Sequence, residues 1–454
     1  TLIQPDDVVG FSLVVTGIER GVSLARRAKE LGARCCIAGN DSAIFRVNQL
    51  LSIEGKPIDA VFTTNSVLVV RSFFRQVNEV SLEQINIPGI EIKTGVQQRS
   101  NEHDFLVSEM TERKKQKGLG QFNADDVFIV PKLDLYPQSY WDEVWSNYRS
   151  QFGHKHANSE TVKNAIALFA QGCTRTQGSD VCSYCTIAGV ADVRIPSREY
   201  LIKTAEVYKN FGIDMVFNVT DSAFEMTSVV NALQQEKIKF NAMTIYGRAQ
   251  GITKMPHQID KWLSVVNDRL LINVGMDSGD DFSLKKGIVK SSFSPGSRVN
   301  ENHIAVENIK KSGAHLHYSL IFGSPGETKE SCESSIEFLE WTMQTLGKQL
   351  DICETDIYWL NFGSPAGKLF DSYPHAVYLA SLAGKFITPQ EWQMHFASYK
   401  NHLFVPMEVE ESWYRFFTNI SLDTAQEYNK KCTKLMAKHT GSIRGRAFKP
   451  SLDV

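Results

Sequence analysis

Three cysteines lie close together in a stretch of the chain that also contains two glycines. They are Cys173, Cys182 and Cys185, spaced C-x8-C-x2-C, and Gly172 and Gly178 let such a loop adopt unusual backbone angles. A structural zinc site needs four protein ligands, whereas three thiolates leave one coordination position open. Thiolates select iron–sulfur clusters and zinc. A [4Fe–4S] cluster with three cysteine-bound irons and one free iron fits this number of ligands.

The remaining five cysteines are scattered along the chain. Eight cysteines among 454 residues are too few for a disulfide-stapled scaffold, so we expect a reducing, cytoplasmic environment. Cys35 and Cys36 lie in an apolar run, where free cysteine behaves as a small hydrophobic residue. We predict that these two, and also Cys332 and Cys353, pack in hydrophobic cores.

The charge balance limits the classes of partner. The chain has 49 basic and 51 acidic residues and a formal net charge of -2, which argues against a broad basic surface for nucleic acid. No apolar stretch approaches the roughly 18–20 residues that cross a bilayer. We therefore expect a small-molecule or peptide substrate, and neither nucleic acid nor membrane as a partner.

The elements around the cysteine loop alternate between strands and helices. Helices are expected between the strands, for example at 197–211, 301–312 and 328–343. Repeated strand–helix units favour a partial parallel (β/α)6 barrel, whose active site would lie at the carboxyl ends of the strands. The six expected strands are residues 165–170, 213–219, 240–246, 270–276, 316–322 and 354–360.

The first hundred residues show a second alternation of the same kind. Strands are expected at 7–15, 35–38 and 60–63, with helices between and after them, which indicates a parallel, doubly wound, Rossmann-like sheet. Three strands make an incomplete half-domain, and we expect the missing strands to precede Thr1. The predicted divisions are a partial Rossmann-like domain at 1–80, a linker or irregular region at 81–160, the barrel at 161–370 and a mostly helical tail at 371–454.

The cysteine loop resembles that of the radical S-adenosylmethionine (SAM) superfamily. In that family a strand leads into Gly-Cys and a C-x3-C-x2-C loop with an aromatic residue before the last cysteine. Gly172-Cys173 and Cys182-Ser183-Tyr184-Cys185 match this pattern, but eight residues replace three between the first two cysteines. We interpret the difference as an insertion that keeps all three thiolates. The resemblance covers roughly residues 162–365.

The resemblance implies which residues contact SAM. Tyr184 would lie near the adenine, and Asp221 and Ser222 follow the second strand, where family members carry polar residues. Arg248 follows the third strand. Asp277-Ser278 follows the fourth, in a pattern similar to Gly-x-Glu-Ser-Gly with Asp in place of Glu. Asp221 and Asp277 could instead cap helices, and Arg248 could form a surface ion pair. The sequence identifies no catalytic residue.

Two histidines and a turn that contains Pro-Gly are further candidates for functional roles. His315 and His317 alternate on one predicted strand and share a face, either as substrate contacts in the barrel lumen or, as we favour, with one of them a core histidine. The turn Gly323-Ser324-Pro325-Gly326-Glu327-Thr328 is typical of radical SAM enzymes that also bind cobalamin. In this turn we expect Glu327 to hold the backbone rather than to act chemically.

The N-terminal half-domain resembles the later strands of a cobalamin-binding domain. The Asp-x-His-x-x-Gly loop whose histidine would ligate cobalt is missing, since no histidine precedes His103. Three explanations stay open: the loop precedes Thr1, which we favour; cobalamin binds without a histidine ligand; or the domain no longer binds it.

The resemblance implies a reaction in which the free iron chelates SAM. One electron, from a donor of the flavodoxin or ferredoxin type, cleaves SAM to methionine and a 5′-deoxyadenosyl radical that abstracts a substrate hydrogen. Such chemistry needs a water-poor lumen that holds cluster, SAM and substrate in line. Our main hypothesis adds cobalamin and methyl transfer. The alternatives are a cobalamin-independent hydrogen abstraction or rearrangement, and a non-catalytic metal- or cluster-binding module.

Overall fold

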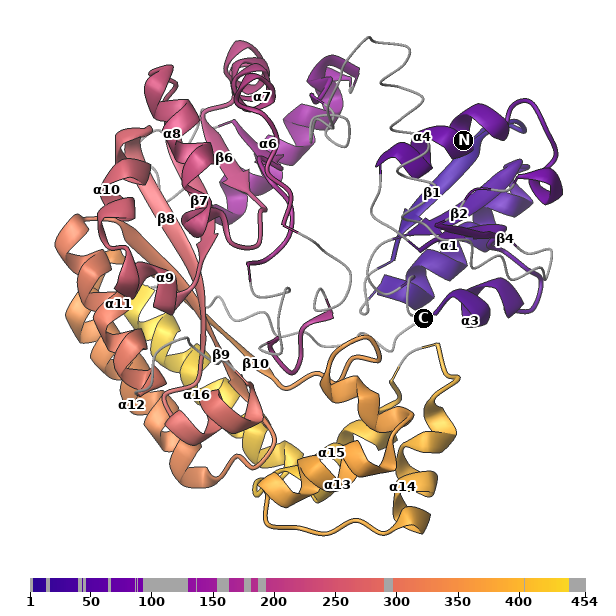
Figure 1. Ribbon diagram of the computed structural model, residues 1–454. Helices are drawn as coiled ribbons and strands as arrows, with labels where there is room; N and C mark the ends of the chain where they lie inside the picture. The colour runs from indigo at the N-terminus through magenta and orange to yellow at the C-terminus, as the bar shows by residue number, and fades with distance from the viewer. Residues whose placement is uncertain are drawn as a thin grey trace.

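The described residues form two β-sheets that are covered by helices (Figure 1). The structure is a computed structural model. It describes residues 3–13, 17–39, 43, 46–63, 67–85, 87, 89–92, 130–135, 137–152, 163–174, 181–186, 193–289, 297–403 and 405–440.

The first sheet contains four strands in sequence order. β1 (Val8–Ser12), β2 (Cys35–Gly39) and β3 (Ala60–Phe62) are parallel, which confirms the three predicted strands. β4 (Ile90–Ile92) pairs antiparallel with β3 and was not predicted. The sheet of the described residues therefore has one more strand than the sequence indicated.

Helices cover both faces of this sheet. α1 (Ile18–Glu30) and α3 (Val47–Ser52) pack on the face that carries Cys36, while α4 (Val67–Gln76) packs on the face that carries Cys35. Successive residues of a strand point to opposite faces, so adjacent cysteines enter two separate cores. Both are fully buried, as predicted, and burial raises the pKa of Cys35 to about 12 and that of Cys36 to about 11.

The second sheet contains six parallel strands in the order β10-β9-β8-β7-β6-β5. Every strand predicted from residue 165 onward is present, and β10 begins four residues earlier than expected. The strands are β5 (Asn164–Ala167), β6 (Met215–Asn218), β7 (Phe240–Gly247), β8 (Val266–Asp277), β9 (His315–Phe322) and β10 (Leu350–Ile357).

Three of the helices that connect these strands begin after a side-chain cap, at Ser197, Ser297 and Thr328. Ser197 accepts a hydrogen bond at the start of α7, and Thr328 does the same for α12. Gly313 ends α11 with φ of 82°, a conformation that favours glycine. The helices are α7 (Arg198–Asn210), α8 (Thr227–Gln235), α9 (Ala249–Lys254), α10 (His257–Ser264), α11 (Arg298–Ser312) and α12 (Lys329–Leu346).

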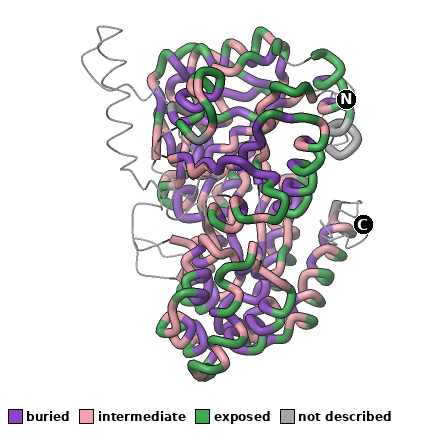
Figure 2. Tube along the Cα trace, turned by 90° about the vertical axis from the view of Figure 1, so that its right-hand side faces the viewer, coloured by how far each residue is buried: buried purple, intermediate pink, exposed green. Residues whose placement is uncertain are grey.

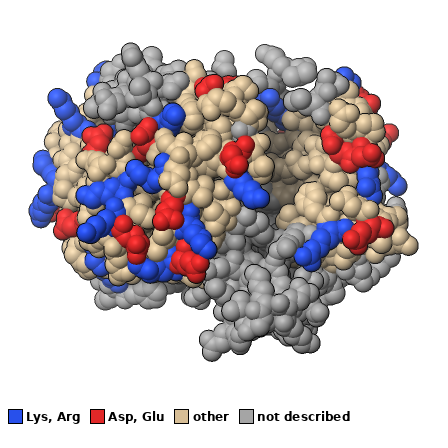
Figure 3. Space-filling model, turned by 90° about the horizontal axis from the view of Figure 1, so that it is seen from above, with Lys and Arg blue, Asp and Glu red and all other residues tan. Residues whose placement is uncertain are grey.

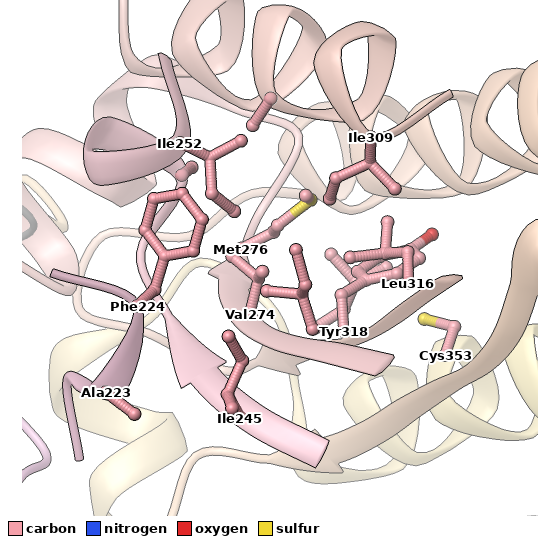
Figure 4. Close-up of a cluster of buried hydrophobic side chains, with 14 of the residues drawn as sticks. Ala223, Phe224, Ile245, Ile252, Val274, Met276, Ile309, Leu316, Tyr318 and Cys353 are labelled. Carbon is pink, nitrogen blue, oxygen red and sulfur yellow. The ribbon is translucent and has the colours of Figure 1, made fainter. Parts of the chain in front are cut away.

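The main hydrophobic core lies between the six-stranded sheet and its helices. In Figure 4, Ile252 and Ile309 come from helices, and Met276, Leu316 and Tyr318 come from strands β8 and β9. Cys332 and Cys353 are buried in this core, as predicted. Figure 2 shows buried residues mainly in the interior of the trace and exposed residues mainly on its outer turns.

The other face of this sheet, which we call the inner face, is less covered. On β9 the residues alternate, so Leu316, Tyr318, Leu320 and Phe322 are buried against helices while His315, His317, Ser319 and Ile321 are half-buried on the inner face. The prediction that His315 and His317 share a face is confirmed.

Helices before and after the sheet complete the molecule. α6 (Gln138–Phe152) lies in the region predicted as a linker, and its buried Trp145 donates to the carbonyl of Asn164 on β5 (3.1 Å). α16 (Leu422–Thr440) packs against β10 and α12. The others are α13 (Tyr373–Leu382), α14 (Pro389–His395) and α15 (Met407–Phe417). Among the described residues, no helix combines the length and apolar character that a membrane crossing requires.

One arginine joins the first sheet's unit to the C-terminal segments. Arg46, which is 5% exposed, donates from Nη1 to the carbonyl of Lys400 (2.9 Å), and its guanidinium lies over the ring of Phe362. Burial lowers the pKa of Arg46 to about 9, although the nearby Asp371 carboxylate opposes this shift.

Candidate functional site

Cys173 lies just beyond the carboxyl end of β5. The chain leaves the strand through buried Phe169 and Ala170, and the Ala170 amide donates to Thr220 Oγ1 in the segment after β6 (3.1 Å). Gly172 then turns the backbone with φ of 87°. The half-buried Cys173 Sγ accepts a hydrogen bond from Ser222 Oγ (3.3 Å). One predicted cluster ligand and one predicted SAM contact are therefore adjacent.

Cys182 and Cys185 occupy a short turn that three distant segments hold in place. The Cys185 amide donates to the Cys182 carbonyl (3.0 Å). Between them, Ser183 donates from its amide to Ile288 (2.8 Å) and accepts at its carbonyl from the Ala366 amide (2.9 Å). The Ser183 hydroxyl also donates to the Gly287 carbonyl (2.8 Å) and lies 2.9 Å from the Tyr358 hydroxyl, just beyond β10.

A hydrogen bond connects this turn to the end of β8. Tyr184 donates from its hydroxyl to Oδ2 of Asp277 (3.0 Å), and Asp277 is 1% exposed. Burial raises the pKa of Tyr184 well above its ordinary value, and the neighbouring Asp277, Cys182 and Cys185 raise it further. The phenol therefore stays protonated and remains a donor. Asp277 has φ of 62°, a conformation that aspartate tolerates better than most residues.

The three cysteines lie at the same end of the sheet but do not form a preassembled metal site. Cys173, Cys182 and Cys185 form no disulfide bond, and all three are half-buried at the carboxyl end of the sheet. Among the described residues, which include all three, no group of three or more Cys, His, Asp or Glu side chains is arranged to hold a metal ion. The donor chemistry suits an iron–sulfur cluster. Of the eight residues between Cys173 and Cys182, where the insertion is predicted, residues 175–180 lie outside the described residues.

Arg248 forms an ion pair, and its partner is a residue that the sequence did not identify. Its Nε donates to Oε1 of Glu225 (3.1 Å), and its amide donates to the same oxygen (3.2 Å). The side chains are 22% and 6% exposed, so the pair is largely buried rather than on the surface. Burial raises the pKa of Glu225, and the Arg248 charge opposes that shift. Glu225 follows Ser222 by three residues, a proximity that could have drawn attention to it.

Asp221 and Ser278 complete the predicted SAM contacts. Asp221 is half-buried in the segment after β6. Ser278 is fully buried, and its hydroxyl lies 3.2 Å from that of Ser335 on α12. The next residue, Gly279, approaches α12 so closely that a Cβ there would lie 2.3 Å from the Ser334 carbonyl oxygen. The structure thus brings together Tyr184 and Asp277, and Cys173 and Ser222, but it directs Ser278 toward α12.

Glu327 holds the turn after β9, as predicted. Its Oε2 accepts hydrogen bonds from the amides of Gly323 and Ser324, and its side chain is fully buried. Burial raises its pKa to about 8, although these amides oppose the shift. Gly323 has φ of 97°, and its carbonyl accepts from Trp413 Nε1 of α15 (2.9 Å).

Replacing Glu327 with glutamine should flatten the pH dependence of stability. Because the folded-state pKa is raised above about 4.5, Glu327 favours folding most below that pH, and the contribution is lost as the pH rises through about 8. At about 1.4 kcal/mol per pKa unit, the difference reaches several kcal/mol. We expect the melting temperature to fall less between pH 5 and pH 9 in Glu327→Gln than in the natural protein. An equal fall of the melting temperature in Glu327→Gln and in the natural protein would contradict this prediction. Glu340→Gln, which makes the same change at an exposed position, is the control.

Comparisons with known proteins show the fold. No family model matches the sequence, and no curated protein is similar to it. The structure resembles a radical S-adenosylmethionine methyltransferase, TsrM, from Kitasatospora setae with cobalamin and a [4Fe–4S] cluster bound. The likeness has a TM-score of 0.55 and 13% identity, and it covers 79% of this chain and 65% of TsrM.

A second structure of TsrM, with tryptophan substrate and the SAM analog aza-SAM bound, gives a TM-score of 0.53 at 13% identity, over 80% of this chain and 64% of that one. The chain thus matches slightly less than two thirds of TsrM. We conclude that it has an α/β fold with a parallel sheet, the fold found in this radical SAM methyltransferase.

Proposed function

We propose that the chain is a radical SAM enzyme and that Cys173, Cys182 and Cys185 hold its [4Fe–4S] cluster. The observation that carries this proposal is the cysteine turn of this chain, which is held against the carboxyl ends of β8 and β10. The fold in which this turn lies resembles that of TsrM. On this proposal the six-stranded sheet is the partial (β/α)6 barrel of the radical SAM type. The domain divisions at 80, 160 and 370 are part of the same proposal.

The chemistry of the donors supports a cluster more than a closed zinc site. Three thiols at one end of the sheet supply three ligands, and a fourth position would stay open for substrate. Cys182 and Cys185 are fixed by the contacts of Ser183, whereas Cys173 is tethered through Ser222.

When bound, the cluster would supply the electron that cleaves SAM to methionine and a 5′-deoxyadenosyl radical. The chain's own residues would bind and orient SAM. The Asp277 carboxylate would accept from a ribose hydroxyl or the ammonium group, while Tyr184 orients that carboxylate. Asp221, Ser222, Arg248 and Ser278 are the other proposed SAM contacts.

Methyl transfer with cobalamin is the version of the reaction that the likeness to TsrM favours, because cobalamin is bound in that protein. The first sheet offers the carboxyl ends of β1, β2 and β3 at one edge, and the residues that follow them, 14–16, 40–42 and 64–66, lie outside the described residues. A cobalamin-independent hydrogen abstraction or rearrangement is the second candidate.

Anaerobic reconstitution tests the proposal. The full chain would be loaded with iron and sulfide, reduced with dithionite and given SAM, with 5′-deoxyadenosine measured by chromatography. Product formation supports the enzyme. A chain that retains zinc, or binds iron without cleaving SAM, would instead be a non-catalytic module. Retained corrin absorbance after incubation with cobalamin separates the first candidate from the second. A reduced flavodoxin or ferredoxin in place of dithionite tests the proposed class of electron donor.

A further inference from the structure

The inner face of the six-stranded sheet has an apolar half. On β5, Ile166 is 65% exposed and Leu168, just beyond the strand, is 42% exposed. Ile166 is paired with Phe217 of β6, whose ring lies 5.6 Å from that of Tyr246 on β7. Large apolar side chains left exposed together often mark ligand-binding surfaces. Strands β5 to β7 therefore form an apolar surface against which an apolar ring or chain could pack.

The other half of the same face is polar. Tyr246 is in register with Asn273 of β8, and Asn273 with His317 of β9. Nε2 of His317 lies 3.6 Å from Oε1 of Glu354 on β10, and the two side chains are 14% and 42% exposed. The polar row thus begins where the aromatic pair ends, and it includes a partly exposed carboxylate.

The amino end of this half is closed by an ion cluster. Arg269 at the start of β8 donates to Oδ1 of Asp351 (2.7 Å) and lies 3.2 Å from Nδ1 of His315. The Arg269 and Asp351 side chains are 11% and 6% exposed, so this cluster forms a floor. His315 belongs to the floor, whereas His317 lies two residues nearer the carboxyl end and next to Glu354.

The polar row is also close to the proposed SAM site. Glu354 is in register with Ser319, which is in register with Gly275. Gly275 precedes Asp277 by two residues, which is about 7 Å along a strand. Two strand spacings of about 4.8 Å also separate β10 from β8, so Glu354 and Asp277 lie on the order of 12 Å apart across the sheet. Figure 3, seen from above, shows a hollow between the part that carries this sheet and the N-terminal unit.

From this division of the face, we infer that the inner face binds an amphipathic small molecule with a protonated nitrogen. Its apolar ring or chain would lie against Ile166, Leu168, Phe217 and Tyr246. Its ammonium group would be held by Glu354, whose Oε1 lies 3.6 Å from Nε2 of His317. Asp356, two residues further along the same face of β10, adds negative charge. The inference rests on the proposed function in one respect, namely that the bound molecule is the substrate.

Matched probes that differ only in charge test the inference. Phenethylamine and 3-phenylpropionate share an apolar body, and their binding to the reconstituted full chain with SAM would be measured by titration calorimetry. We expect phenethylamine to bind at least tenfold more tightly. Glu354→Gln should remove this preference, and Glu354→Lys should reverse it, because the charge that selects the nitrogen is removed or inverted. Ile166→Asn should weaken both probes alike.

The control is Glu337→Gln, which makes the same change at an exposed position on α12 and should leave both affinities unchanged. Equal affinity for the two probes, no binding of either, or a preference that survives in Glu354→Gln would overturn the inference. A failure of the proposed function gives a different result. If SAM is never cleaved but the preference for the amine is observed, the binding site is supported and the radical chemistry is wrong. If SAM is cleaved without the preference, only the substrate class is wrong.

Discussion

Replacing Cys182 with alanine is expected to abolish both the cluster and SAM cleavage. A cluster left with two thiolates loses a direct ligand, which should cost more than the 10–100-fold typical of residues that only support a metal ligand. We therefore expect 5′-deoxyadenosine formation to fall by more than about a hundredfold. Iron and sulfide content and the visible absorbance should fall in parallel. Ser183 keeps its backbone contacts and Tyr184 its hydrogen bond to Asp277 in this variant, so the fold should be retained.

The matched control is Cys36→Ala, which removes a thiol from the core of the first sheet. It should lower the stability slightly and leave the iron content and SAM cleavage unchanged. If Cys182→Ala retained the full iron content, or if Cys36→Ala lost it, the assignment of the ligands to residues 173–185 would be wrong. Circular dichroism of each variant would show whether the fold survives.

Local signals in the sequence were sufficient to predict most of the second sheet. Each strand combines an apolar face with a helix that follows, and the helix ends carry their own markers, such as Ser197, Thr328 and Gly313. These effects act over a few residues. They can therefore be recognised without knowing what packs against them.

The missed elements depend on contacts between distant residues. β4 has only three residues, Ile90–Ile92, and it is a strand because β3 offers it an edge. Glu225 pairs with Arg248 across 23 residues, and Ser183 contacts Gly287 and Tyr358 across more than a hundred. No periodicity or cap marks such partners.

The candidate site could be predicted from the sequence only in part. The spacing of Cys173, Cys182 and Cys185 predicted which thiols are at the carboxyl end of the sheet, because the strand before them sets that position. It could not predict that Ser183 fixes the turn of Cys182 and Cys185 while Cys173 contacts Ser222, since the contacting residues lie in the segments that follow β6, β8 and β10. The number of donors follows from the sequence, but their convergence depends on tertiary structure.

Asp277→Asn is expected to weaken SAM binding about 10–100-fold and to leave the cluster intact. Hydrogen bonds to a charged group are worth about 1.5–3 kcal/mol, and asparagine keeps the shape of aspartate without its charge. Asparagine also tolerates the φ of 62° at this position, so the backbone should not change. The KM for SAM, measured from initial rates of 5′-deoxyadenosine formation, should rise more than kcat falls.

Tyr184→Phe separates binding of SAM from positioning of Asp277. The phenol donates only to a carboxylate that is already buried, so its loss should raise the KM for SAM several-fold and less than Asp277→Asn does. Combining the two changes should then add little, because both act through the same carboxylate. Asp260→Asn on α10 makes the same change at an exposed position and serves as the control. A normal KM in Asp277→Asn, together with a lower melting temperature, would mean that the carboxylate only holds the cysteine turn against β8.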